Sequence, residues 1–235
     1  EVSPSAVVSL AAVAVPFSAP EDVILKTNVG IAHNVTAAAV ASGAKKVIIA
    51  SSPSIMGYGS PVTWVPPRLP LDEDVPPQPW HGYGLSKYAA EQVAAMFARQ
   101  TQDVTFISFR PCFVIAPEEW EGAPTQQGHT VAERLDDPAL SAVALFNYVD
   151  ARDVTDFLIT ALKNIERVDN GSVFFVGAKD ALARRPLAEL IPEHFPTLAH
   201  LAGDIAGDGP AFSVQKAKDV LGWEPTRSWR TELKH

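Results

Sequence analysis

The stretch Tyr83-Gly84-Leu85-Ser86-Lys87 opens a helical run that continues to Gln100. Residues four apart lie on one face of a helix, so the side chains of Tyr83 and Lys87 are expected to point the same way. An ammonium beside a phenol lowers the pKa of the phenol, which makes the tyrosine an acid/base candidate near neutral pH. The spacing alone also fits an ordinary surface helix.

Apolar runs on both sides of this stretch predict strands of a parallel sheet. Residues 46–50 form a short buried strand that leads into Ser51-Ser52-Pro53-Ser54, and residues 104–109 form another that ends in Arg110-Pro111. In parallel α/β sheets, functional groups gather just beyond the carboxyl ends of the strands. A serine at that place and a tyrosine at a nearby helix start can share one substrate oxygen.

With these motifs the chain resembles the extended short-chain dehydrogenase/reductase superfamily, in its NAD-dependent epimerase/dehydratase branch. The resemblance implies an α/β fold: a Rossmann-like doubly wound parallel sheet with a smaller C-terminal substrate-binding lobe. The motifs follow the family's order and spacing over nearly the whole chain. They lie at residues 10–12, 27–30, 51–57, 83–87, 110–111, 148–154 and 221–225.

Mapped onto the family, residues 1–117 are the C-terminal part of the NAD(P)-binding domain. Residues 118–235 are mainly the substrate-binding lobe, with residues 145–177 returning to the first domain. The pattern of apolar residues, glycines and prolines predicts the remaining elements. These are strands at 6–10 and 172–176, helices at 22–41, 153–164, 185–191 and 213–221, a proline-rich loop at 58–82 and an irregular segment at 118–133.

The resemblance also implies roles for individual residues, with NAD or NADP as cofactor. Tyr83 exchanges a proton with the substrate, Ser52 hydrogen-bonds the same substrate oxygen, and Lys87 holds the ribose and lowers the pKa of Tyr83. The expected cofactor-binding residues are Leu10, Ala11, Ala12, Asn28, Tyr83, Lys87, Pro111 and Val114. The expected substrate-binding residues are Ser52, Pro53, Ser54, His81 and Phe113.

The expected function is that of an NAD(P)-dependent oxidoreductase or epimerase/dehydratase, an isomerase in the epimerase case. Its substrate would be a sugar, a sugar nucleotide or a small carbonyl or hydroxyl compound. Cys112-Phe113 stands where many sugar-nucleotide enzymes have Gly-Asn, which leaves a smaller or less polar substrate open. The alternative is a non-catalytic dinucleotide-sensing or scaffold protein on the same fold, which would need no acid/base group.

The family's Gly-x-x-Gly-x-x-Gly fingerprint, which lets the backbone approach the cofactor pyrophosphate, is absent from these 235 residues. Mapped onto the family pattern, Glu1 falls just before the fourth strand. Either the sequence is part of a longer chain or the protein is naturally short. An apolar strand at 6–10 without a neighbour would be an exposed edge, so a longer parent chain is expected.

Composition limits which classes of binding partner and which cellular compartment the sequence predicts. The formal charge is −8 with no long basic run, so a small-molecule substrate is expected, not nucleic acid. Cys112 is the single cysteine, which favours a reducing cytoplasm, and no histidine pattern indicates a metal site. No apolar run is long enough to span a membrane. Residues 6–16 mimic a signal-peptide core but follow Glu1 and no basic residue. A homodimer is the candidate assembly.

Overall fold

The computed structural model describes residues 3–233, which divide into two compact units. The first unit contains residues 3–57, 76–111 and 159–174. The second contains residues 58–75, 112–158 and 175–233. The chain is an α/β protein, as the sequence predicts. No helix of the described residues is long and apolar enough to cross a membrane.

The first unit is built on a sheet in the strand order β1-β2-β3-β6. The strands are β1 (Ala6–Ser9), β2 (Lys46–Ala50), β3 (Thr105–Pro111) and β6 (Ser172–Val176), of which residues 172–174 belong to this unit. β2 pairs in parallel with β1 and with β3. The three predicted strands therefore lie parallel in one sheet, and the predicted Rossmann-like arrangement is confirmed.

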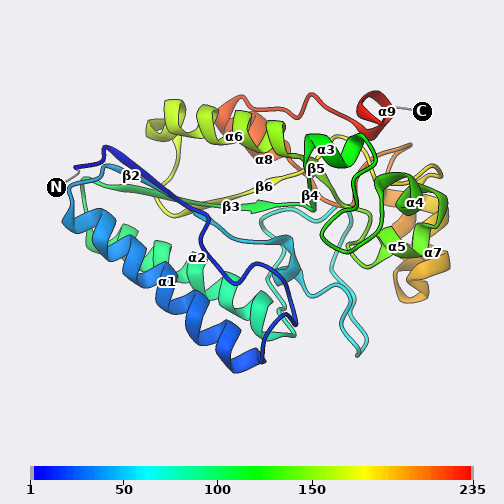
Figure 1. The fold of residues 1–235 in the computed structure, drawn as a ribbon, viewed down its shortest axis with the longest axis horizontal. Coiled ribbons are helices and arrows are strands. Elements are labelled where there is room, and N and C mark those ends of the chain that lie inside the picture. Colours follow the sequence, from blue (N-terminus) through cyan, green and yellow to red (C-terminus); the bar gives the residue numbers. More distant parts are fainter. Residues whose placement is uncertain (1–2, 234–235) are drawn as a thin grey trace. The chain divides into compact units, whose positions relative to one another are not determined.

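Two long helices, α1 (Glu21–Ala41) and α2 (Gly82–Gln100), lie side by side on one face of this sheet (Figure 1). Small side chains allow this close packing, because alanines of both helices meet apolar side chains of β2 and β3. The end of α6 (Ala151–Asn164) lies on the opposite face. The core between the two helices and the sheet contains Ala32, Ala39, Ala44, Val47, Ile49, Ala90, Ala94, Val104 and Phe106.

The second unit combines a short parallel ribbon with small helices. β4 (Val114–Ile115) pairs with β5 (Val149–Asp150), which leads directly into α6. The helices are α3 (Pro117–Trp120), α4 (Val131–Asp136), α5 (Pro138–Ala142), α7 (Leu187–His194), α8 (Gln215–Leu221) and α9 (Trp229–Glu232), with a 3₁₀ turn at Pro196–Asp204. A further 3₁₀ turn, Ile165–Arg167, follows α6 in the first unit. Its core is formed by Ile115, Trp120, Val131, Leu135, Tyr148, Ala178, Leu182 and Trp229.

The expectation of an irregular segment over residues 118–133 was wrong in part, because α3 and the start of α4 lie there. α4 begins with a capping box. The Thr130 hydroxyl accepts a hydrogen bond from the Glu133 N–H at 3.2 Å, and the Glu133 carboxylate accepts one from the Thr130 N–H at 2.8 Å. Both free donors at the helix start are thereby satisfied.

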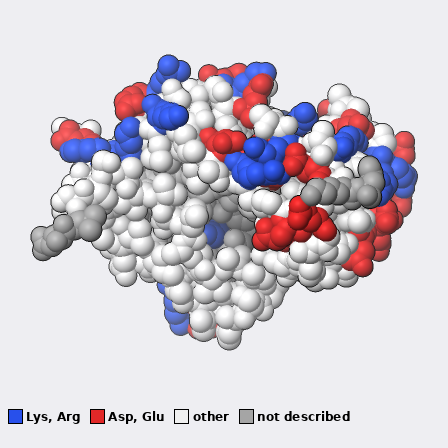
Figure 2. Space-filling view, turned by 45° about the horizontal axis from the view of Figure 1, so that its top comes forward, with Lys and Arg blue, Asp and Glu red and all other residues white. Residues whose placement is uncertain are grey.

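Charged side chains of both signs are intermingled on the face drawn in Figure 2, and the described residues of this face form no broad basic patch. The mixture agrees with the net charge of −8. A nucleic-acid surface would need basic side chains gathered on one face.

Candidate active site

Ser52, Tyr83 and Lys87 come together within the first unit. Ser52 follows β2 and caps the 3₁₀ turn Pro53–Met56: its Oγ accepts a hydrogen bond from the Ser54 N–H at 3.2 Å. The side chains of Tyr83 and Lys87 lie one turn apart on α2, with the lysine Nζ 5.7 Å from the centre of the tyrosine ring. The Ser52 side chain acts on the Tyr83 phenol, whose pKa it lowers. A serine hydroxyl, a phenol and an amine thus lie close together near the carboxyl end of β2.

The electrostatics of the pair differ from the sequence expectation. Burial raises the pKa of Tyr83, and the hydrogen bond with Ser52 offsets this only in part. Burial also lowers the pKa of Lys87 to about 8. The lysine Nζ donates to the Ala50 carbonyl at 3.0 Å instead of reaching the phenol oxygen. The predicted lowering of the Tyr83 pKa by Lys87 was therefore wrong for this structure, because desolvation dominates.

A buried charge pair, which was not predicted from the sequence, lies next to Ser51 on α2 and β3. Glu91 receives two hydrogen bonds from Arg110, at 2.9 and 3.0 Å, and both side chains are 3% exposed. The Ser51 hydroxyl donates to the same carboxylate at 2.5 Å. The pair ties α2 to the ends of β2 and β3. The only signal in the sequence was spacing, since Glu91 lies four residues after Lys87 on one helix face.

Asn28 joins the segment after β1 to α2. Its side-chain oxygen accepts from the Val13 N–H at 2.7 Å, and its amide donates to Ser86 Oγ at 3.0 Å. Ser86 in turn donates to the Tyr83 carbonyl at 2.8 Å. A small pocket opens here. Its lining consists of Ser9, Ala11, Ala12, Asn28, Ala32, Ile49, Ala50, Ser86, Lys87 and Ala90.

Of the expected cofactor residues, Ala11, Ala12, Asn28 and Lys87 line this pocket, whereas the Leu10 side chain is 60% exposed and does not. Pro111 ends β3 in the same unit. Val114 belongs to the second unit, on β4. The cofactor roles of all of these residues stay predictions.

His81 is the N-cap of α2, a structural role that the sequence did not indicate. Its Nδ1 accepts a hydrogen bond from the Gly84 N–H at 3.0 Å, and its ring stacks on that of Tyr83 at 6.2 Å between centroids. Burial lowers the pKa of His81, with the Glu21 carboxylate acting in the opposite direction. Pro53 and Ser54 are buried in the neighbouring 3₁₀ turn, and the Ser54 hydroxyl lies 2.9 Å from that of Ser52.

Phe113, expected at the substrate, lies in the second unit. Its N–H donates to the Asn147 side chain at 2.8 Å, and its ring lies 4.6 Å from the guanidinium carbon of Arg134. Cys112, just before it, is buried, which raises the pKa of its thiol well above the ordinary value. No group of described residues has the make-up of a metal site.

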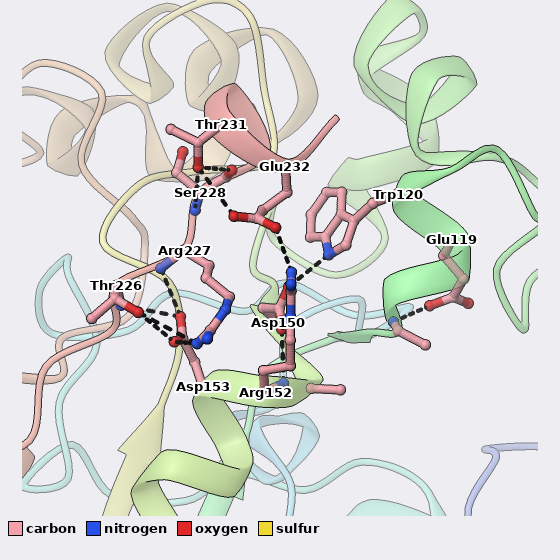
Figure 3. Close-up of polar contacts among 12 residues, drawn as sticks. Glu119, Trp120, Asp150, Arg152, Asp153, Thr226, Arg227, Ser228, Thr231 and Glu232 are labelled. Carbon is pink, nitrogen blue, oxygen red and sulfur yellow. Dashed lines mark hydrogen bonds and ion pairs between the residues drawn. The ribbon is translucent and has the colours of Figure 1, made fainter. Parts of the chain in front are cut away.

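Arg152 and Asp153, at the start of α6, are engaged within the second unit (Figure 3). Arg152 forms ion pairs with Asp150 and Glu232. Asp153 accepts hydrogen bonds from Thr226 and Arg227, the N–H of Arg227 at 2.9 Å. These contacts fasten the C-terminal segment to the start of α6.

Comparisons with known proteins agree with this architecture. The model of the NAD dependent epimerase/dehydratase family matches residues 1–177. The UDP-glucose 4-epimerase of Lacticaseibacillus casei is 24% identical over 212 residues, which cover 78% of this chain and 60% of that protein. The chain thus spans about three fifths of the length of this curated relative.

Solved structures share the fold. A short-chain dehydrogenase/reductase superfamily protein from Agrobacterium tumefaciens, solved with bound NAD, has a TM-score of 0.67 and 22% identity, covering 97% of this chain and 77% of that one. RMD from Pseudomonas aeruginosa, complexed with NADPH, has a TM-score of 0.68 and 20% identity, with coverages of 98% and 79%.

Proposed function

Because the chain belongs to the NAD dependent epimerase/dehydratase family, we propose that the intact protein is an NAD(P)-dependent enzyme acting on a sugar nucleotide or a related hydroxyl or carbonyl compound. The observation that carries this proposal is the meeting of Ser52, Tyr83 and Lys87 beside the pocket that Asn28 and Lys87 line. A hydroxyl, a phenol and an amine at one place form an acid/base site without need of a metal.

The lining of the pocket carries groups that a dinucleotide would use. Ala11 and Ala12 present little beyond backbone, which lets a flat ring or a ribose approach closely, and the Lys87 amine lies in the same lining. When bound, the nicotinamide supplies hydride transfer, and the protein contributes position and polarity. Lys87 would hold the ribose hydroxyls.

Tyr83 would move the proton at its phenol oxygen. Burial keeps the phenol protonated, so Tyr83 is suited to donate a proton to an oxygen that gains negative charge as a carbonyl is reduced. In the oxidation of a hydroxyl, the phenolate would take the proton. Ser52, which acts on the pKa of Tyr83, would orient the same oxygen. Asn28 would fix the distance between the pocket and α2.

Sugar nucleotides are the first substrates to test, because similarity to a UDP-glucose 4-epimerase covers 78% of this chain. The intact protein would be incubated with NAD or NADP and a panel of sugar nucleotides, free sugars, polyols and aldehydes. Chromatography detects an epimer or a dehydrated product, and nicotinamide absorbance detects net oxidation. Turnover of at least one member is expected. Dinucleotide binding without turnover of any member would favour the sensor or scaffold alternative.

A further inference from the structure

His81 holds the first turn of α2 with a ring nitrogen. Its Nδ1 accepts a hydrogen bond from the Gly84 N–H at 3.0 Å. An imidazole nitrogen accepts a hydrogen bond only while it carries no proton, so the ring is neutral and its proton is on Nε2. In an imidazolium both nitrogens are donors, and the N–H of the buried Gly84 would lose its partner. This cap of α2 therefore exists only while His81 is neutral.

Tyr83 lies inside the turn that this hydrogen bond closes. The turn has little room to shift, because a Cβ at Gly84 would lie 3.2 Å from the Ser54 carbonyl oxygen and 3.3 Å from Cε1 of His81. Ser54 belongs to the 3₁₀ turn that Ser52 caps. The contact between His81 and Gly84 thus helps to determine where Tyr83 lies relative to Ser52.

The ring of His81 makes contacts that a helix cap does not need. It stacks on the ring of Tyr83 with an angle of 15° between the planes. The rings of Phe17 and Trp80 also contact it, with centroids 5.3 and 4.9 Å away. Serine, threonine, aspartate and asparagine are the preferred N-caps, and none of them has a ring. A histidine at this position therefore adds support for the face of the Tyr83 ring.

The surroundings of His81 favour the neutral ring. Burial lowers its pKa, and the carboxylate of Glu21, at the start of α1, acts in the opposite direction. Phe17 and Trp80, from the other segments packed against the ring, carry no charge. The start of α2 also disfavours a positive charge. The cap is accordingly intact at neutral pH, and the imidazolium forms only as the pH falls below the ordinary histidine value of 6.5.

We propose that His81 is a positioning residue for Tyr83, which it holds in place by capping the Gly84 N–H and by supporting the phenol ring. Protonation of His81 would release the first turn of α2 and move the phenol. The catalytic consequence rests on the proposed function. The coupling between His81 and Tyr83 rests on the contacts of these two residues.

Nuclear magnetic resonance on the intact protein tests the coupling without any substrate. With ¹⁵N in histidine and glycine, the scalar coupling between Nδ1 of His81 and the Gly84 nitrogen detects their hydrogen bond directly. We expect this coupling at neutral pH and its loss as the His81 ring titrates. With ¹³C in the tyrosine rings, the Tyr83 signals, identified by their absence in Tyr83→Phe, should shift with the same midpoint.

His81→Asn is the matched variant, because asparagine is a preferred N-cap but has no ring and does not titrate. In this variant the Tyr83 signals should not shift over the same pH range. A missing coupling at neutral pH would overturn the proposal. Tyr83 signals that ignore the titration of His81, or that shift equally in His81→Asn, would overturn it as well.

Steady-state kinetics with the best substrate test the catalytic consequence. His81→Asn keeps a cap without the ring, and His81→Phe keeps a ring without the cap. Both should lower kcat on the order of 10-fold, because the phenol is less well positioned. The KM for the dinucleotide should not change, because His81 is not part of the pocket lining.

The pH profile separates positioning from a merely structural role. The kcat of the parent should fall on the acid side with the midpoint of His81, and His81→Asn should lack this fall. His33→Asn, at an exposed histidine of α1, is the control and should keep the parent kcat and profile. A parent-like kcat and acid limb in His81→Asn would contradict the proposal. If the coupling is observed and no substrate turns over, the result counts only against the proposed function.

Discussion

At Lys87 and Tyr83, burial changes the pKa of each side chain more than the neighbouring side chain does. Both side chains are buried, and burial disfavours the charged form of each: the pKa of Lys87 falls to about 8, and the pKa of Tyr83 rises. The Lys87 amine is directed at the Ala50 carbonyl, 3.0 Å away. Sequence spacing places two side chains on one face of a helix, but it does not reveal which atom each one reaches.

The lowered pKa of Lys87 predicts a pH dependence of stability. Between about 8 in the folded protein and the ordinary value of 10.5, the unfolded chain binds the extra proton. Stability contributed by this residue should therefore rise as the pH increases through that range. Denaturant unfolding of the parent and of Lys87→Met, at about pH 8 and about pH 10, measures the difference. Identical pH dependence in the two proteins would mean that the amine titrates normally.

The Glu91–Arg110 pair predicts a large loss of stability from one conservative change. Glu91→Gln keeps the shape of the side chain but leaves the buried guanidinium of Arg110 without its counter-ion, at an expected cost of about 3–5 kcal/mol. Asp22→Asn is the matched control, because the exposed pair of Asp22 with Lys26 should contribute little. Chemical denaturation of both variants measures the difference. Equal losses of stability in the two variants would contradict the burial of the Glu91–Arg110 pair.

At the scale of elements, α1 and α2 meet so closely that one position between them excludes a side chain. A Cβ at Gly82 would lie 2.6 Å from the Glu21 carbonyl oxygen and 2.8 Å from its carboxylate. The Gly82 N–H also donates to that carboxylate. The start of α2 is thereby held against the start of α1, next to the His81 cap.

Two glycine-to-alanine changes should have opposite signs. Gly82→Ala should destabilise the protein by about 1–3 kcal/mol, because backbone of α1 must move. Gly30→Ala, inside α1 with no atom within 4 Å of the new Cβ, should stabilise it by about 0.5–1 kcal/mol. Thermal unfolding measures both. A stabilising Gly82→Ala would contradict the close approach of the two helices.

The sequence predicted the long elements well and the short ones poorly. β1, β2, β3, α1 and α6 follow from buried apolar runs, amphipathic spacing and clear stop signals. β4 and β5 have two residues each, so no pattern predicts their pairing. The Ser52–Tyr83–Lys87 cluster could be predicted because strand ends and helix starts converge in a parallel sheet. The partners of Glu91 could not, because Ser51 and Arg110 lie 40 and 19 residues away from it in the sequence.

In the whole molecule, the chain passes from one unit to the other several times, because each unit consists of three separate segments. The family match covers residues 1–177, and the chain corresponds to 60% of the length of the first curated relative. The acid/base cluster and the Asn28 pocket belong to the first unit. Enzyme activity should therefore be measured on the intact protein, with the best substrate from the panel described above.

The central claim is that Tyr83 transfers the proton, and Tyr83→Phe tests it most directly. Phenylalanine keeps the ring and its packing but removes the hydroxyl, so folding should be retained while turnover falls by ~10²–10⁴-fold. Tyr88→Phe, on the same helix and only half-buried, is the matched control and should keep the parent rate. Steady-state rates of the three intact proteins decide the question. A Tyr83→Phe variant as fast as the parent would contradict the catalytic assignment.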